Sequence, residues 1–247
     1  TGNKDLDFHG KAITVRTASG NPATCVIDCQ GSGRGFYFHS NETAAAVVDG
    51  FTIRNGSVTS SSSGGVSGGG VYCSGASPSL TNCIIYGNTA TSSSSAYGGG
   101  VYCSAASPAL TNCIISGNTA RGASASAVRG GGLYCAGASP SLTNCVISGN
   151  AATGSSASLG GGMYCSRSSA RLTNCTILSN SASNGGAFCD DSNTAPLIPT
   201  LTNCILWGDS PQEIYVNSGP PPIVTYCDVQ GGYTGTGNIH ANPLVLD

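Results

Sequence analysis

Two arginines and two adjacent aspartates are the side chains in this sequence best placed to do chemistry on a ligand. Arg167 and Arg171 precede Asp190 and Asp191. A carboxylate pair beside a guanidinium could bind or cleave a sugar, because carboxyl groups act as general acids and bases and arginine neutralises charge. The alternative is a surface salt bridge in an irregular loop, which contributes little. The candidate ligand-binding residues are therefore Arg171, Asp190 and Asp191, and no residue stands out as catalytic.

The rest of the sequence offers little material for catalysis. Residues 55–189 contain no aspartate or glutamate, the last lysine is Lys11, and the three histidines are His9, His39 and His240. No C-x-x-C pair is present, so we expect neither a metal site nor a cofactor. The sequence thus favours a protein that is not an enzyme.

A repeated stretch surrounds these residues and must position them. Gly68–Asn88 returns with small changes as Gly98–Asn118, Gly130–Asn150 and Gly160–Asn180, and a looser fifth copy begins at Gly185. Each copy holds short strand-forming runs between glycine, Ser-Pro and Gly-Asn turn signals, without helical periodicity. Such a unit cannot bury its apolar face alone, so it must stack on its neighbours. The repeats predict an all-β parallel β-helix, a β-solenoid of about eight to nine coils.

Stacking in register would turn recurring residues into columns spaced about 4.8 Å apart. Strand alternation, with its phase reset by a bend near Asn82, directs Leu80, Cys83 and Ile85 inward and Thr81 and Ile84 outward. Asparagine amides can hydrogen-bond to one another, and asparagine tolerates a left-handed bend, which favours a structural role over a binding role. The expected structural ladders are Cys73, Cys103, Cys135, Cys165 and Cys189; Cys83, Cys113, Cys145, Cys175 and Cys204; Asn82, Asn112, Asn144, Asn174 and Asn203; and Asn88, Asn118, Asn150 and Asn180.

The chain contains thirteen cysteines. So many would usually indicate an oxidised, secreted protein, yet cysteine is also a small residue that buries well. Stacked cysteines have nearly parallel Cβ directions, which disfavours disulfides within a column. We expect Cys103, Cys113, Cys135 and Cys145 to be buried, mostly as thiols or with a few bridges across the coil.

Composition narrows the possible partners. Only 8 % of residues are charged and the net charge is −2, so nothing attracts the chain to nucleic acid. No apolar run is long enough to insert into a membrane. A chain that begins at Thr1 resembles a processed product, and we expect it to be secreted or at the cell surface.

The repeats favour one continuous domain over residues 1–247. Residues 1–57 would form degenerate first coils, 58–209 the regular repeats, and 210–247 a last coil and cap. Ser/Ala-rich inserts such as Thr89–Tyr97 recur at the same point of each coil. They should pile up along one side as flexible or self-packed loops.

Two features of the repeats resemble a known family. Gly98–Val101 with Ile115–Asn118 resembles the GGA[ILV] and FxxN motifs of polymorphic outer-membrane proteins, whose passengers are autotransported adhesins. The third residue is glycine in four copies and Ala187 in the fifth, and Ile or Leu replaces Phe. Gly10–Val15 and Tyr226–Gln230 are similar to segments of secreted bacterial right-handed parallel β-helix repeat proteins. The resemblance implies a right-handed coil and a group that includes adhesins, surface-layer components and polysaccharide-degrading enzymes.

We therefore expect a non-enzymatic extracellular or cell-surface solenoid with a structural, adhesive or self-assembling role. Its partners would be itself, end to end or side by side, and host or matrix glycans. One alternative is polysaccharide binding or cleavage at Arg171, Asp190 and Asp191. A second is ice binding by the outward threonine column that begins at Thr81, although Arg171 interrupts the column beside it.

Overall fold

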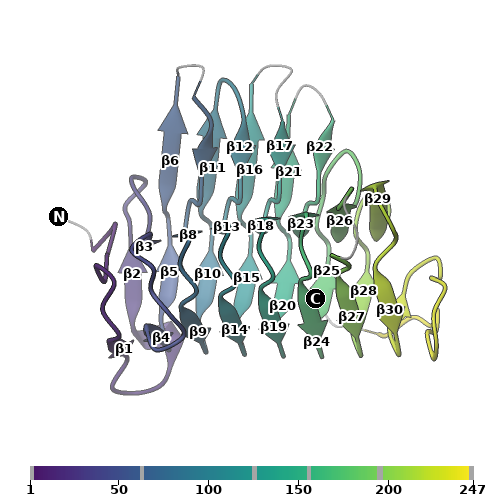
Figure 1. Ribbon diagram of the computed structural model, residues 1–247, viewed down its shortest axis with the longest axis horizontal. Coiled ribbons are helices and arrows are strands. Elements are labelled where there is room, and N and C mark those ends of the chain that lie inside the picture. Colours follow the sequence, from purple (N-terminus) through teal and green to yellow (C-terminus); the bar gives the residue numbers. More distant parts are fainter. Residues whose placement is uncertain (1–2, 62–63, 124–126, 155–156, 194–196, 245–247) are drawn as a thin grey trace.

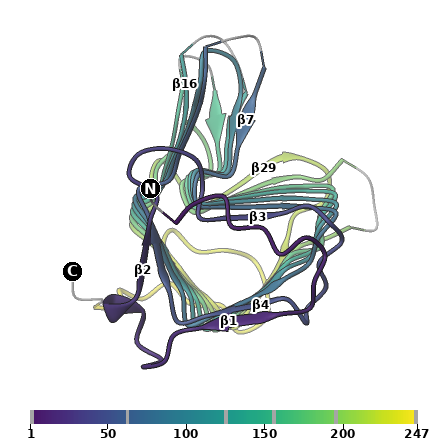
Figure 2. The same ribbon diagram turned by 90° about the vertical axis from the view of Figure 1, so that its left-hand side faces the viewer.

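The structure is a computed structural model of the chain. It describes residues 3–61, 64–123, 127–154, 157–193 and 197–244. The chain winds into a parallel β-helix with three long sheets, from which a narrow projection rises on one side (Figures 1 and 2). The described residues contain no α-helix, and their one helical turn is the 3₁₀ segment Pro22–Thr24.

Each coil contributes one strand to each long sheet. Sheet I contains β3 (Phe36–Phe38), β8 (Val71–Ser74), β13 (Val101–Ser104), β18 (Leu133–Ala136), β23 (Met163–Ser166), β26 (Phe188–Asp191) and β29 (Ile214–Ser218). Sheet II contains β1 (Thr14–Arg16), β4 (Val47–Asp49), β9 (Ser79–Thr81), β14 (Ala109–Thr111), β19 (Ser141–Thr143), β24 (Arg171–Thr173), β27 (Thr200–Thr202) and β30 (Ile223–Thr225). Sheet III contains β2 (Val26–Asp28), β5 (Thr52–Arg54), β10 (Ile84–Tyr86), β15 (Ile114–Ser116), β20 (Val146–Ser148), β25 (Thr176–Leu178), β28 (Ile205–Trp207) and β31 (Asp228–Val229).

These sheets confirm the predicted fold class. Sheet I holds seven strands and sheets II and III hold eight each, so the complete coils are slightly fewer than the expected eight to nine. Neighbouring strands in each long sheet are parallel, and those of the regular coils pair residue for residue, as in the pairing of Leu80, Leu110 and Leu142. Leu80, Cys83 and Ile85 are buried, whereas Thr81 and Ile84 are only partly covered. The alternation read from the sequence therefore places the core inside the coil.

The inserts form a second pair of sheets, which we call the fin. One sheet consists of β6 (Ser57–Ser60), β11 (Thr89–Ser92), β16 (Thr119–Gly122) and β21 (Ala151–Thr153). The other consists of β7 (Val66–Ser67), β12 (Ala96–Tyr97), β17 (Val128–Arg129) and β22 (Ser158–Leu159). Ala96, Ala120, Val128 and Ala152 form a small core between them. The inserts thus pile up on one side as predicted, and their bases are paired strands rather than flexible loops (Figure 2).

The cysteine columns follow the expected register with one exception. Cys73, Cys103, Cys135 and Cys165 pair in sequence along sheet I and are buried. Cys189 instead pairs with Tyr164, and Asp190 takes the place beside Cys165. The Gly-Gly-x tripeptide sets the phase of each copy, and in the fifth copy the cysteine comes one residue earlier after it. The expectation that Cys189 continues the first cysteine column is therefore wrong.

The second cysteine column lies at the bend between sheets II and III. Cys83, Cys113, Cys145, Cys175 and Cys204 are buried there, and the column has a sixth member, Cys227. Each thiol donates to backbone carbonyls, for example Cys113 Sγ to Leu80 O at 3.5 Å. All thirteen cysteines are free thiols. Most of them fill the core as small apolar side chains.

The outer asparagine ladder, Asn82 to Asn203, follows the same bend on the outside of the coil. Its members adopt left-handed φ angles of 52–55°. Each side-chain amide donates to the asparagine one coil earlier, at 3.2 Å from Asn112 Nδ2 to Asn82 Oδ1, and Asn82 Nδ2 donates to Asp49 Oδ1 at 2.8 Å. The hydrogen bonds therefore run towards the N-terminus and end on a carboxylate.

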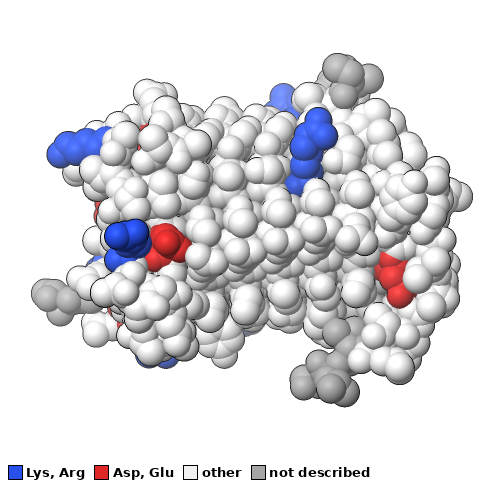
Figure 3. Space-filling view, turned by 90° about the horizontal axis from the view of Figure 1, so that it is seen from below, with Lys and Arg blue, Asp and Glu red and all other residues white. Residues whose placement is uncertain are grey.

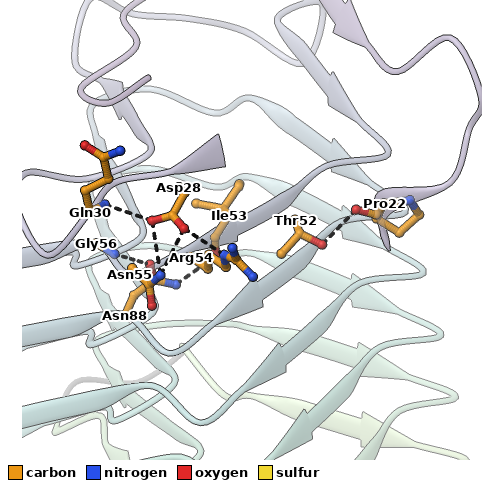
Figure 4. Close-up of polar contacts among 9 residues, drawn as sticks. All are labelled: Pro22, Asp28, Gln30, Thr52, Ile53, Arg54, Asn55, Gly56 and Asn88. Atoms are coloured by element: carbon orange, nitrogen blue, oxygen red, sulfur yellow. Dashed lines mark hydrogen bonds and ion pairs between the residues drawn. The ribbon is translucent and has the colours of Figure 1, made fainter. Parts of the chain in front are cut away.

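The inner asparagine ladder, Asn88 to Asn180, is fully buried and runs in the opposite direction. Asn88 Oδ1 accepts from Gly56 N at 2.8 Å, and its Nδ2 donates to Ile53 O (Figure 4) and to Asn118 Oδ1, both at 3.0 Å. The chain of amides continues to Asn180, whose Nδ2 donates to Asp209 Oδ1 at 2.7 Å. This ladder also ends on a carboxylate, but at the C-terminal end and inside the protein.

A tail closes the C-terminal end of the coil. Ile239 N donates to Cys227 O, Asn238 Oδ1 accepts from Cys227 N at 3.0 Å, and Asn238 Nδ2 donates to Val224 O. These contacts cover backbone groups that an open last coil would expose. Residues 245–247, the end of the expected cap, lie outside the described residues.

Candidate functional site

The fifth copy of the repeat places its two aspartates on opposite faces of sheet I. In β26, Phe188 and Asp190 point into the coil, while Cys189 and Asp191 point outward. The register with β29 shifts between Asp190 and Asp191, which marks a local irregularity. The two carboxyls therefore cannot act on one ligand from the same side.

Asp191 is held by four neighbours on the outer face. Tyr164 Oη donates to its Oδ2, while Ser218 Oγ and Asn217 Nδ2 donate to its Oδ1 at 2.6 and 2.9 Å. Arg129 Nη2 lies 4.0 Å from Oδ2. Burial alone would raise the pKa of Asp191, but these hydrogen bonds lower it below its ordinary value. Both carboxyl oxygens of Asp191 therefore accept hydrogen bonds from the protein itself.

Arg171 does not join this cluster. It lies in β24 of sheet II, where it pairs with Ser141 and Thr200 and is exposed. Sheet II is a different wall of the coil from the sheet that holds Asp190 and Asp191. The predicted combination of Arg171 with the two aspartates is therefore wrong, and the arginine beside Asp191 is Arg129 from the fin.

Asp190 sits inside the coil, in the column that cysteines occupy elsewhere. It is 0 % exposed, and in the described chain neither carboxyl oxygen has a hydrogen-bond partner. Burial raises the pKa of Asp190 to about 6, because the core disfavours the charged form. No substrate could reach it without opening the coil.

A second pair of acids, missed in the sequence, ends the inner asparagine ladder. Asp209 Oδ1 accepts from Asn180 N and Nδ2 at 2.6 and 2.7 Å, and Asp209 N donates to Glu213 Oε1 at 3.2 Å. Both side chains are buried, and Asp209 Oδ2 and Glu213 Oε2 have no other partner in the described residues. Burial, followed by the neighbouring Asp209, raises the pKa of Glu213 to about 9. This raised pKa favours a protonated Glu213 beside Asp209 at neutral pH.

A ladder of tyrosines covers the outer face of sheet I beneath the fin. Consecutive rings lie 4.9–5.4 Å apart in Tyr37, Tyr72, Tyr102, Tyr134 and Tyr164. Side chains from the fin pack over it: Tyr97 lies 4.8 Å from Tyr134, and the Arg129 guanidinium lies 4.9 Å from Tyr164. The tyrosine before each first cysteine of the repeat was the sequence signal for this ladder.

The arrangement offers no assembled catalytic centre among the residues that the structure describes. Asp191 is saturated, Asp190 is enclosed, and the Asp209–Glu213 pair is buried at a ladder end. No group of three His, Cys, Asp or Glu side chains in the described ranges could hold a metal ion. The described chain also contains no helix with the length and apolarity that a membrane crossing requires.

Comparison with known proteins identifies the fold family. The family model described as "Right handed beta helix region" matches residues 2–219, most of the chain. Neither the curated proteins nor the solved structures give a significant match.

Proposed function

Because the chain belongs to the right-handed β-helix family, we propose that it is a non-enzymatic solenoid that works outside the cell or at its surface. Its role is structural and adhesive: it presents long outer faces to other copies of itself and to glycans. A β-helix fold alone hosts many functions, so the support for this proposal comes from the side chains.

The observation that carries the proposal is the use of the carboxyl groups in the C-terminal coils. Asp191 is bound by Tyr164, Ser218 and Asn217, and Asp209 is bound by the inner asparagine ladder. A general acid or base must reach a proton on the substrate. These carboxyls instead hold together adjacent coils, which favours binding by whole surfaces over cleavage of a polysaccharide.

The outer faces suit surface contacts. The side of the coil seen from below is white over most of its central part, with one prominent blue side chain on it (Figure 3). On sheet III, Ile84, Ile114 and Val146 form an outward aliphatic column, and Ile114 is 39 % exposed. Few charges oppose the approach of a second copy along such faces.

Light scattering over a hundredfold range of protein concentration tests the self-assembling part of this proposal. We expect the average mass to rise with concentration, and a constant monomer mass would contradict it. Ile114→Lys, which places a charge on sheet III, should reduce lateral association. Thr111→Lys adds the same charge to sheet II. It shows whether a loss of association is specific to sheet III or follows from any added charge.

Threonines offer weaker support for the ice-binding alternative. The column of Thr81, Thr111, Thr143 and Thr173 is in register on sheet II. Its neighbour runs Ala109, Ser141, Arg171 and Thr200, so a long charged side chain stands in the middle of the face. The arginine interrupts the flat array that ice binding would need.

A further inference from the structure

A pocket lies where the fin begins. It has a volume of about 640 Å³ and lies between the first fin strands, the start of the tyrosine ladder and the turn before β3. Its lining includes Ser57 and Thr59 of β6, Ser67 of β7, and Arg34, Tyr37 and Tyr72. This volume is in the range of sites that bind small ligands.

The pocket exists because the coil before β6 has no fin strands. Residues 30–34 make a low turn there instead, with left-handed φ angles at Gln30, Gly31 and Gly33. Gly33 has a φ of +63°, a left-handed conformation that favours glycine at this turn. β6 and β7 are consequently the edge strands of the two fin sheets, and both line the pocket.

Small residues keep the pocket open. Along the fin, Ser67 is followed in register by Tyr97, while Arg129 is followed by Leu159. In the later coils these larger side chains fill the space above the ladder, and Tyr134 and Tyr164 are buried beneath them. The opening is thus specific to the first fin coil.

Arg34 gives the pocket a fixed positive group. Its guanidinium lies 4.9 Å from the Tyr37 ring centre and 5.2 Å from that of Tyr72. Nε and Nη2 donate to Gly68 O and Ser67 O at 3.1 and 3.3 Å, and these bonds hold the group in place. Nη1 has only a long ion pair, 3.8 Å from Asp5 Oδ1, among the described residues. Its N–H groups can therefore serve a ligand.

A second cation stands close by. Lys4 Nζ donates to Ser32 Oγ at 2.5 Å, and Ser32 lines the pocket. Lys4 and Arg34 together outweigh the single carboxylate of Asp5 in this cluster. Serine and threonine hydroxyls supply both donors and acceptors around the charge.

We propose that this pocket binds a sugar residue that bears an anionic substituent, either a carboxylate or a sulfate, within a glycan chain. The anion pairs with Arg34, and the sugar hydroxyls exchange hydrogen bonds with Ser57, Thr59 and Ser67. This assignment rests on the proposed adhesive function and names one ligand class for it.

Fluorescence anisotropy with three labelled tetrasaccharides tests the assignment. One is sulfated (derived from heparin), one carries only carboxylates (derived from polygalacturonate), and one is neutral (maltotetraose). The folded protein should bind at least one anionic probe more tightly than maltotetraose, and less tightly as salt increases. The arm that binds identifies the substituent. Failure of both anionic probes to bind would overturn the proposal.

Two matched pairs of variants locate the binding. Arg34→Ala should weaken binding of the anionic probe about tenfold or more, because a charge-assisted hydrogen bond is lost. Arg121→Ala removes the same charge from an exposed position of the fin outside this pocket and should leave binding intact. Thr59→Trp should block the pocket, whereas Thr91→Trp, one coil further along the same column, should not. Wild-type affinity in both Arg34→Ala and Thr59→Trp would overturn the proposal.

Light scattering on the same proteins separates this proposal from the adhesive function. Self-association without binding of either anionic probe would refute the pocket and leave the adhesive function standing. Probe binding that depends on Arg34, in a protein of constant monomer mass, would support the pocket and count against self-assembly.

Discussion

The regular coils and the coils after Gly185 build the same interior columns from different side chains. In the regular coils, the column of sheet I contains thiols such as Cys135 and the inner ladder contains amides such as Asn150. In the later coils the same columns contain the carboxyls of Asp190 and Asp209. Amides do not titrate and burial disfavours the charged thiolate, whereas burial raises the pKa of Asp190 to about 6 and also raises the pKa of Asp209. The fold thus keeps its geometry across both regions, and the second region adds buried carboxyls that titrate.

The largest loss of stability is expected from a substitution at Asn150, in the regular coils. Its Nδ2 donates to Ile115 O at 2.8 Å and to Asn180 Oδ1 at 2.9 Å, and its Oδ1 accepts from Asn118. Asn150→Ala leaves several buried polar groups without partners, so we expect a loss of about 3–5 kcal/mol in the free energy of unfolding. Denaturant unfolding measures it.

Asn144→Gly is the matched control in the outer ladder. It keeps the left-handed backbone and loses hydrogen bonds only where water can replace them, so it should cost about 1 kcal/mol or less. Equal losses in the two variants would contradict the distinction between the buried and the exposed ladder.

The next prediction concerns the pH dependence of stability in the later coils. The pKa of Glu213 is about 9 in the folded protein and 4.5 in an ordinary glutamate. Between these values the folded protein holds a proton that the unfolded chain releases. Stability should therefore fall as pH rises from 4.5 to about 9, by at most about 1.4 kcal/mol per pH unit.

Glu213→Gln should flatten this dependence, because an amide of similar shape does not titrate. Chemical denaturation at several pH values in the window compares the two proteins. Stability that rises with pH in the wild type, or an unchanged slope in the variant, would argue against a proton held by Glu213.

A smaller effect is expected in the thiol column of the regular coils. Cys113 is fully buried and donates to Leu80 O. Cys113→Ala should lower the free energy of unfolding by about 1–3 kcal/mol, as for removal of a small apolar group. Thiol titration of the wild type should show little reaction until denaturant is added. Rapid reaction of most thiols in the native state would contradict their burial.

Much of the fold could be predicted because the repeat is strict. Strand alternation placed Leu80 inside and Thr81 outside, and the Asn-Cys dipeptide marked the bend with its ladders. The error at Cys189 arose because cysteine was used as the marker of register, whereas the preceding glycines set the phase.

The candidate site was less predictable for a physical reason. Which wall of the coil a residue occupies depends on the bends between strands, so Arg171 and Asp190 could not be assigned to different sheets from their spacing. Glu213 comes from a segment without a counterpart in the other copies. Only the position of Asp209 after glycine, where other copies have asparagine, hinted at the acid pair.

The central claim is that the carboxyls of the irregular coil stabilise the fold and do not catalyse a reaction. We would compare the wild type with Asp190→Asn/Asp191→Asn in a cleavage screen on neutral and acidic glycans and in light scattering. We expect no cleavage by either protein and the same concentration-dependent mass in both. Cleavage of a glycan by the wild type that is lost in the double variant would contradict it.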